Sequence, residues 1–366
     1  MIKAASSNLS TKSPSRNDTS VAKVRRALEE DSAKPLELRG QLSDETTVAV
    51  LDSFHPDQAS KFSLHGDMVH SVVVLSGFQE SEVVKIENTT GGEVNSLMAD
   101  LLYQKGPGTD EERVDGYIEL CASQTLSKTN GTLKNLLAQP ELNIKTINQS
   151  QGYTRVMVYK LLQDPAFFYN EPGKLTEVGE RLAALSGMND WDGSEESVHK
   201  LKQALIDRVD RVVDNSEWLK GLQAEHTDLL QKLRDRGVGV VTSAGNSYDD
   251  CTDLAKAGFQ VPEDFDDDVT SVGPKIVVGA LHNMLTEDPS DDQQAYFSSR
   301  YDAVDILVDG VDVWTEAGAA WGTSYAAPKV SARREQLRRE HPSWDIDFLE
   351  NQTMSEYRLY DQQPRS

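Results

Sequence analysis

The sequence predicts an α/β protein built on a mostly parallel sheet with helices on both faces. Short apolar runs rich in β-branched residues alternate with segments of helical periodicity from about residue 46 onward, which is the pattern of repeated βαβ units. Several of these runs are apolar throughout, as is typical of strands buried on both sides. Hydrophobic residues make up 38% of the 366 residues, so the chain can form a packed core and is neither fibrous nor wholly disordered.

The expected elements follow one another along the chain. The first strand is expected over residues 46–52, where a β-branched run ends in an aspartate. A helix is expected next, over residues 64–78, with apolar residues on one face. Further strands are expected over residues 81–88, 143–152, 237–246 and 273–281, and connecting helices over 114–126 and 227–237, the second with Gly237 as its C-cap.

Two parts of the chain lie outside this alternation. Residues 1–44 are expected to form a flexible leader, because residues 1–20 are rich in Ser, Thr and Asn; residues 20–33 have the spacing of one short helix. Residues 45–366 are expected to form one domain. Within it, residues 155–222 are predicted to be a helical insertion that either packs on the main body or acts as a lid or partner-docking element.

The charge of the chain argues against two classes of partner. Lys and Arg number 37 against 60 Asp and Glu, a formal net charge of −23, which opposes binding to nucleic acids and to anionic membranes. No apolar run approaches the length of a membrane span or of a signal peptide. We therefore expect a cytoplasmic protein, or one exported without a cleavable signal peptide, as an effector would be. The two cysteines, Cys121 and Cys251, are expected to be reduced.

Four polar residues stand where the predicted strands end or helices begin. In an open parallel sheet, ligands bind beyond the carboxyl ends of the strands. Asp52 ends the first strand and Asn246 ends the strand over residues 237–246. His65 and Ser324 each lie at the start of a predicted helix. Each residue alone is more often structural, so the hypothesis depends on the four together.

Together these residues supply what acyl transfer requires. A serine hydroxyl is a poor nucleophile until a neighbouring imidazole takes its proton. The imidazole needs a carboxylate that fixes its tautomer and stabilises the imidazolium. The oxyanion needs donors already aimed at it, which an asparagine amide and a backbone N–H at a helix N-terminus can provide.

The surrounding motifs resemble those of subtilisin-like serine proteases (subtilases). VAVLDSF resembles the aspartate motif of that family, HGDMVHSVV the histidine motif, VTSAGNS the oxyanion motif and GTSYAAPKV the serine motif. Their order along the chain is also that of the family. The resemblance implies a three-layer subtilisin-like fold and a serine endopeptidase acting on protein or peptide substrates. It assigns the triad to Asp52, His65 and Ser324 and the oxyanion hole to Asn246.

The resemblance also implies which residues bind the substrate. TINQSQG is similar to the family strand whose Ser-x-Gly segment pairs with the substrate backbone. The pocket for the side chain before the scissile bond would lie between this strand and the segment before Asn246. The implied substrate-binding residues are Ser150, Gln151, Gly152, Ser243, Ala244 and Gly245.

The histidine motif departs from the family pattern. The usual HGTHVAG reads HGDMVHSVV, with Asp67 and Met68 in place of a Thr and a His. His55, in a polar loop, and His70, over one turn further along the helix, are rival histidines, and His65 is favoured over both. The departure supports an alternative hypothesis, a catalytically inactive binding protein with the subtilase fold.

No metal or cofactor site is predicted. Some relatives bind calcium, but this chain has no clear motif for it. Residues 190–196 are expected to begin a helix capped by Ser194. The acidic run over residues 263–268 is expected to be a solvated loop.

Overall fold

The computed structural model describes residues 20–40, 42–54, 64–103, 107–163, 169–171, 174–188, 191–284, 286 and 290–360. Its centre is one sheet with the strand order β1-β3-β2-β4-β7-β8-β10-β13, and β9 pairs with β8. The strands from β3 to β10 run parallel, and the edge strands β1, β9 and β13 are antiparallel to their neighbours. The predicted mostly parallel sheet is therefore confirmed. The strands are β1 (Leu38–Arg39), β2 (Val48–Asp52), β3 (Val83–Glu87), β4 (Thr146–Gln149), β7 (Gly239–Ser243), β8 (Ile276–His282), β9 (Gln293–Gln294), β10 (Ile306–Asp309) and β13 (Arg358–Leu359).

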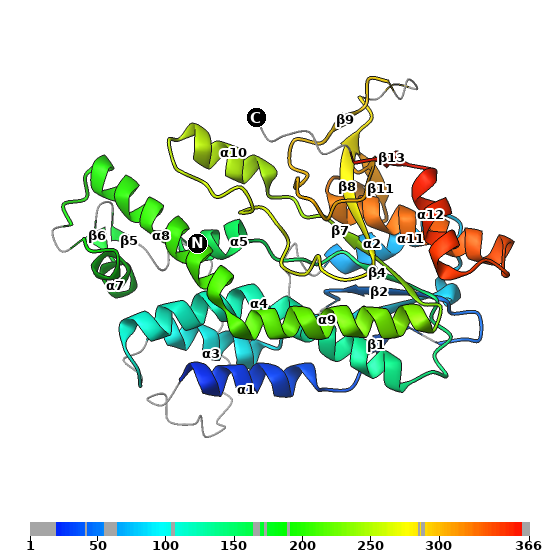
Figure 1. Cartoon of the computed structure of the whole chain (residues 1–366), viewed down its shortest axis with the longest axis horizontal. Helices are drawn as coiled ribbons and strands as arrows, with labels where there is room; N and C mark the ends of the chain where they lie inside the picture. The colour runs from blue at the N-terminus through cyan, green and yellow to red at the C-terminus, as the bar shows by residue number, and fades with distance from the viewer. Residues whose placement is uncertain are drawn as a thin grey trace.

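Helices cover both faces of this sheet, which explains why its strands are apolar throughout. Successive side chains of a strand point to opposite faces. In β2, Val48 and Val50 pack against α2 (His65–Leu75), whereas Ala49 and Leu51 pack in the same core as α4 (Asp110–Ala138) and α9 (Glu217–Asp235). Figure 1 shows α2 and α11 (Thr323–Glu340) on one side of β2 and α4 and α9 on the other.

A second hydrophobic core lies mainly among helices. It joins α4 to α1 (Val21–Ser32), α3 (Gly92–Tyr103), α5 (Arg155–Leu162), α7 (Glu177–Leu185), α8 (Glu195–Asn215) and the start of α9, and it also includes Leu175, Phe265 and Val269. Ser194 caps α8 as predicted, because its Oγ accepts a hydrogen bond from the N–H of Ser197 at 3.2 Å. Figure 1 shows α7 and α8 extending from the body on the side away from α12 (Ile346–Ser355).

The segment over residues 155–222 differs from the prediction in composition. Besides α5, α7, α8 and the start of α9, it contains the antiparallel pair β5 (Tyr169–Glu171) and β6 (Lys174–Leu175). Its helices share one core with α1, α3 and α4, so the segment packs on the main body. Docking of a partner on it stays a prediction.

The predicted extent of the flexible leader is wrong for residues 21–39. The short helix expected there is present as α1, and it buries Val24 and Leu28 completely. β1 then pairs with β3 at the edge of the sheet. Two apolar side chains one turn apart suffice to dock this polar helix on α4, where its contacts stabilise it. Residues 1–19 lie outside the described part of the chain.

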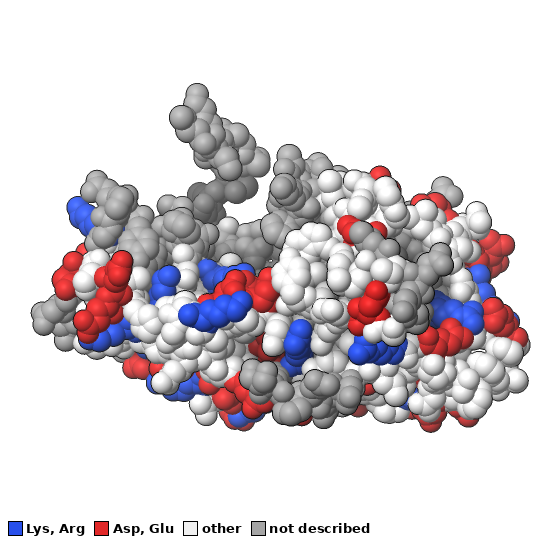
Figure 2. Space-filling view, turned by 90° about the horizontal axis from the view of Figure 1, so that it is seen from above, with Lys and Arg blue, Asp and Glu red and all other residues white. Residues whose placement is uncertain are grey.

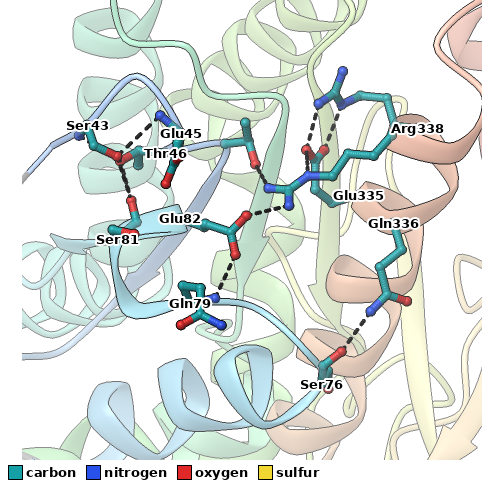
Figure 3. Close-up of polar contacts among 12 residues, drawn as sticks. Ser43, Glu45, Thr46, Ser76, Gln79, Ser81, Glu82, Glu335, Gln336 and Arg338 are labelled. Carbon is teal, nitrogen blue, oxygen red and sulfur yellow. Dashed lines mark hydrogen bonds and ion pairs between the residues drawn. The ribbon is translucent and has the colours of Figure 1, made fainter.

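The C-terminal half of α11 is fastened to the loops at the amino ends of β2 and β3 (Figure 3). The fully buried Glu335 accepts hydrogen bonds from Arg338, at 2.8 Å to each carboxylate oxygen. Gln336 donates to the carbonyl of Ser76 at 2.7 Å. Arg339 bridges Glu82 and the hydroxyl of Thr47. The pair Glu335–Arg338 lies within the helix, and the contacts of Gln336 and Arg339 hold the helix whose first turn carries Ser324 against the loops.

Acidic and basic side chains are interspersed over the face seen in Figure 2, rather than gathered by sign. Charged side chains pair with one another elsewhere in the described chain too, as Lys232 does with Asp228 and Lys200 with Glu196. No helix within the described ranges is both long enough and apolar enough to cross a membrane.

The packing of α1 on α4 gives a stability prediction. A Cβ on Gly131 of α4 would lie 1.9 Å from the carbonyl oxygen of Ser32, so Gly131→Ala must push the helices apart. We expect this change to lower the free energy of unfolding by about 1–3 kcal/mol. The control is Gly221→Ala in α9, where a Cβ meets nothing within 4 Å and should stabilise by about 0.4–1 kcal/mol. Denaturant unfolding of both variants checks this, and equal effects would contradict the docking of α1.

Candidate active site

A fully buried carboxylate lies at the carboxyl end of β2. Oδ1 of Asp52 accepts a hydrogen bond from the N–H of Ser53 at 2.7 Å and lies 2.8 Å from Nδ1 of His65. Its other oxygen, Oδ2, is buried and has no hydrogen-bond partner among the described residues. Among the described residues, the compensation for burying this carboxylate therefore comes from the N–H of Ser53 and the ring of His65.

The glycine after His65 allows the histidine helix to start against the end of β2. The N–H of Gly66 donates to the carbonyl of Ser53 at 3.2 Å. A Cβ at position 66 would lie 2.5 Å from that oxygen and 2.8 Å from the ring of Phe54. Only glycine lets the first turn of α2 approach closely enough for the ring of His65 to reach Asp52.

Burial and charge act in opposite directions on His65. Burial lowers the pKa of the ring, and the charge and hydrogen bond of Asp52 raise it. The net effect is a pKa raised above the ordinary 6.5. The contact at Nδ1 also leaves Nε2 as the nitrogen that can take a proton from another group.

Of the two rival histidines, His70 faces away from Asp52. Its Nε2 lies 3.5 Å from a carboxylate oxygen of Glu80, and its ring is buried beneath that residue. Burial and the charge of Lys85 lower the pKa of His70. His55 lies outside the described residues.

The first turn of α11, which carries Ser324, meets His65 through Tyr325. Gly322 precedes the helix with φ 143°, a conformation that side chains disfavour, and its N–H donates to the carbonyl of Gly310 at 2.8 Å. The ring of Tyr325, next to the serine, lies 5.8 Å from the ring of His65. The hydroxyl of Ser324 donates to the carbonyl of Ser150 at 3.2 Å, and within the described residues it makes no hydrogen bond to His65.

A proline inside α11 explains the polar contact beneath the serine. Pro328 has no N–H to donate to the carbonyl of Ser324, four residues earlier. The hydroxyl of Ser150 donates to this carbonyl instead, at 3.0 Å. Asn148 donates to the same hydroxyl at 2.9 Å and accepts from Ser331 at 3.0 Å. This buried chain ties the first turns of α11 to the end of β4.

Asn246 lies against the other side of the same helix start. Its Oδ1 accepts hydrogen bonds from the N–H of Thr323 at 2.9 Å and from the hydroxyl of Thr323 at 3.0 Å. Its nitrogen, Nδ2, donates to none of the described residues and would lie 3.3 Å from a Cβ on Gly322. The amide is therefore oriented with its oxygen fixed and its N–H groups available beside Ser324.

The predicted substrate-binding residues form two neighbouring segments. Ser150, Gln151 and Gly152 follow β4, and Ser243, Ala244 and Gly245 end β7 and follow it. The segments lie next to each other in the sheet order. The hydroxyls of Thr154 and Ser247 are 3.0 Å apart and join the two segments just beyond Gly152 and Gly245. The N–H of Gly245 donates to the hydroxyl of Thr323, so it is held by the start of α11.

One residue beside these segments was not predicted to belong there. Asp268, from the acidic run expected to be solvated, is buried, as are Phe265 and Asp266, so that expectation is wrong for these three residues, whereas Glu263 is exposed. Oδ1 of Asp268 accepts from the N–H groups of Tyr153 and Thr270, and its Oδ2 lies 1.5 Å from where a Cβ on Gly152 would be. Burial raises the pKa of Asp268. The one feature of the sequence that could have indicated this contact is the glycine at position 152, since only glycine leaves room for the carboxylate of Asp268.

Another acidic group surrounds an arginine. Carboxylates of Asp210, Asp214 and Asp264 come within 4.8 Å of one another. The guanidinium of Arg155, at the start of α5, lies among them and pairs with each. The negative charge of these three carboxylates is thus partly neutralised by the guanidinium of Arg155.

The chain matches no family model, and no curated protein matches it. Its fold is similar to those of a lanthipeptide protease (12% identity, TM-score 0.39, covering 89% of this chain and 81% of that one) and a cold-adapted subtilisin-like serine proteinase (15%, 0.36, 89% and 88%). It is also similar to the patellamide maturation protease PatA (14%, 0.36, 81% and 79%). With TM-scores below 0.5, these likenesses do not decide the chemistry.

The contact between Asp52 and His65 predicts how the ring titrates. Asp52→Asn removes the charge that favours the imidazolium but leaves the ring buried, so the pKa of His65 should fall from above 6.5 to below it. Titration of the ring protons by NMR measures this. The control is Asp67→Asn, because Asp67 is on the same helix but pairs with Lys85 at 2.7 Å. An unchanged His65 pKa in Asp52→Asn would show that the two side chains do not interact in solution.

Proposed function

We propose that the chain is a serine endopeptidase of the subtilisin-like kind. The observation that carries this proposal is the 2.8 Å contact between the buried Asp52 and Nδ1 of His65, next to a helix start that bears Ser324. A buried carboxylate and an imidazole are the two groups that convert a serine hydroxyl into a nucleophile. Asn246, on the opposite side of that helix start, supplies the fourth component.

In the first half of the reaction, Ser324 attacks the scissile carbonyl of a peptide. Nε2 of His65 takes the hydroxyl proton as the bond from Oγ to the carbonyl carbon forms. The proton is then given to the departing amine, the C–N bond breaks, and an acyl-enzyme remains on Ser324. For this step the hydroxyl of Ser324 must turn from the carbonyl of Ser150 toward the ring.

Asp52 and Asn246 stabilise the charges that develop. Asp52 faces the imidazolium formed on His65, and its buried position makes this attraction stronger than in water. Nδ2 of Asn246 and the N–H of Ser324 donate to the oxyanion. In the second half, water attacks the acyl-enzyme with His65 as base, which releases the carboxylic acid and restores the serine.

The substrates expected from this site are extended polypeptide segments. A peptide that lies beside Ser150, Gln151 and Gly152 would add to them as a further strand, with main-chain hydrogen bonds that do not depend on sequence. The space between these residues and Ser243, Ala244 and Gly245 would then receive the side chain before the scissile bond.

An inactive binding protein is the second candidate. The observation that favours it is the hydrogen bond of the Ser324 hydroxyl to Ser150 rather than to His65. Catalytic hydrogen bonds often tighten only when substrate is bound, so this contact alone does not exclude catalysis. A fluorophosphonate separates the two candidates, because it reacts only with an activated serine.

Replacement of the nucleophile tests the proposal. Ser324→Ala should abolish both the hydrolysis of peptides and labelling by a fluorophosphonate probe, since no other group can form the acyl-enzyme. The control is Ser355→Ala at the exposed end of α12, which should retain both activities. Labelling that persists in Ser324→Ala, or a wild-type chain that is never labelled, would favour the binding protein.

Replacement of the oxyanion donor should have a graded effect. Asn246→Ala removes one donor to the tetrahedral intermediate and should lower turnover by about 10²–10³-fold. The probe labels the same serine with less loss, because the triad is intact. Steady-state kinetics measure this effect. The control is Asn215→Ala, because Asn215 is an exposed asparagine at the end of α8. Turnover unaffected by the loss of Asn246 would remove it from the site.

A further inference from the structure

A cavity of about 300 Å³ lies beside the carboxyl ends of β8 and β10. Its walls include the rings of Tyr296, Phe297 and Trp321, with Val311 and Gln294 among the other lining residues. None of these residues was singled out by the sequence motifs. The volume is at the small end of the range for ligand sites, which suits one large side chain rather than a cofactor.

The aromatic walls of this cavity are poorly covered. Tyr296 is 65% exposed and Trp321 is 59% exposed, among the most exposed of the large hydrophobic side chains described. The ring of Phe297 is buried between them, with its centroid 5.4 Å from that of Tyr296 and 5.1 Å from that of Trp321. Exposed apolar surface of this kind around a hollow is typical of a binding site.

A hydrogen-bond donor in the same wall lacks a partner. Nε2 of Gln294 is buried from solvent and has no hydrogen-bond partner among the described residues. A buried donor without an acceptor is unfavourable, so such groups usually meet a ligand or an ordered water. The side chain of Gln294 can therefore donate a hydrogen bond to a bound group that has an oxygen as well as an apolar surface.

The cavity lies next to the proposed nucleophile, on the side opposite the substrate-binding strand. Trp321 directly precedes Gly322 and lies three residues before Ser324. Along the sheet, Ser150 follows β4, Asn246 follows β7, and the cavity comes next, beyond β8. A peptide that enters along Ser150 and reaches Ser324 therefore continues toward the cavity with the part that becomes the leaving amine.

We propose that this cavity binds an aromatic side chain of the substrate on the C-terminal side of the scissile bond. The inference rests on the proposed endopeptidase function and names the substrate that this function selects. Offset or edge-to-face contact with the exposed rings of Tyr296 and Trp321 favours a ring over an aliphatic chain. Nε2 of Gln294 donates to an oxygen of the bound segment.

Internally quenched peptides with one N-terminal half test this assignment. In each pair of peptides, one position after the cleaved bond carries either Tyr or Gly. The kcat/KM for the Tyr peptide is divided by that for the Gly peptide, for the wild type and for each variant. A general change in activity affects both values equally and does not change this ratio. The wild-type ratio should exceed about tenfold at one position, the gain expected from burying one aromatic side chain. Trp321→Ala should lower this ratio about tenfold, and Gln294→Leu should lower it less.

The matched control is Trp314→Ala in β11 (Val313–Thr315), because Trp314 is 72% exposed and does not line the cavity. This variant should keep the wild-type ratio. A wild-type ratio near one at every position would overturn the inference, and so would an equal fall of the ratio in Trp314→Ala and Trp321→Ala. In either case, hydrolysis of the peptides would still support the proposed function.

Binding to Ser324→Ala separates the two proposals when no hydrolysis is seen. Fluorescence anisotropy compares labelled peptides that carry Tyr or Gly at the varied position. Tighter binding of the Tyr peptide that is lost in Ser324→Ala/Trp321→Ala would support the cavity even if the endopeptidase proposal failed. Equal binding of both peptides would overturn the assignment of the cavity.

Discussion

The buried carboxylate of Asp52 is the constraint on which the rest of the site depends. A charge at the end of β2 without water must be matched by a partner, because an unpaired buried ion costs several kcal/mol. The ring of His65 provides that match at 2.8 Å, and it can do so only because Gly66 lets α2 begin against Ser53. The same contact raises the pKa of His65 and leaves its second nitrogen facing outward.

Helix α11, which carries the proposed nucleophile, spans the sheet and is held near its start and in its second half. Near its start, Ser150 satisfies the carbonyl that Pro328 leaves free. Farther along, Arg334 is buried and donates to the carbonyl of Lys145 at 3.0 Å, at the beginning of β4. These contacts make α11 a rigid element, which is what a site needs if its groups are to keep their geometry without substrate.

Local patterns predicted the parts of the site that depend on local structure. Asp52 and Asn246 could be placed because each follows a short apolar strand, and Ser324 because glycine and small residues mark the start of its helix. The role of Asp268 could not be predicted, since acidic runs are usually solvated and its burial depends on contact with Gly152, far away in the chain. Helix α1 was not predicted to be part of the folded body for the same reason. Its few apolar residues stabilise the fold only because they pack against α4. The aromatic cavity joins four separate segments that no single motif contains.

The rate of fluorophosphonate modification as a function of pH, with the modified residue mapped by mass spectrometry, tests the central claim most directly. If Asp52, His65 and Ser324 act as one unit, the adduct forms on Ser324, and its rate constant rises with pH through a single pKa above 6.5, because only the neutral ring of His65 can take the proton. An adduct on another residue, or a rate that does not vary with pH in this range, would contradict the account.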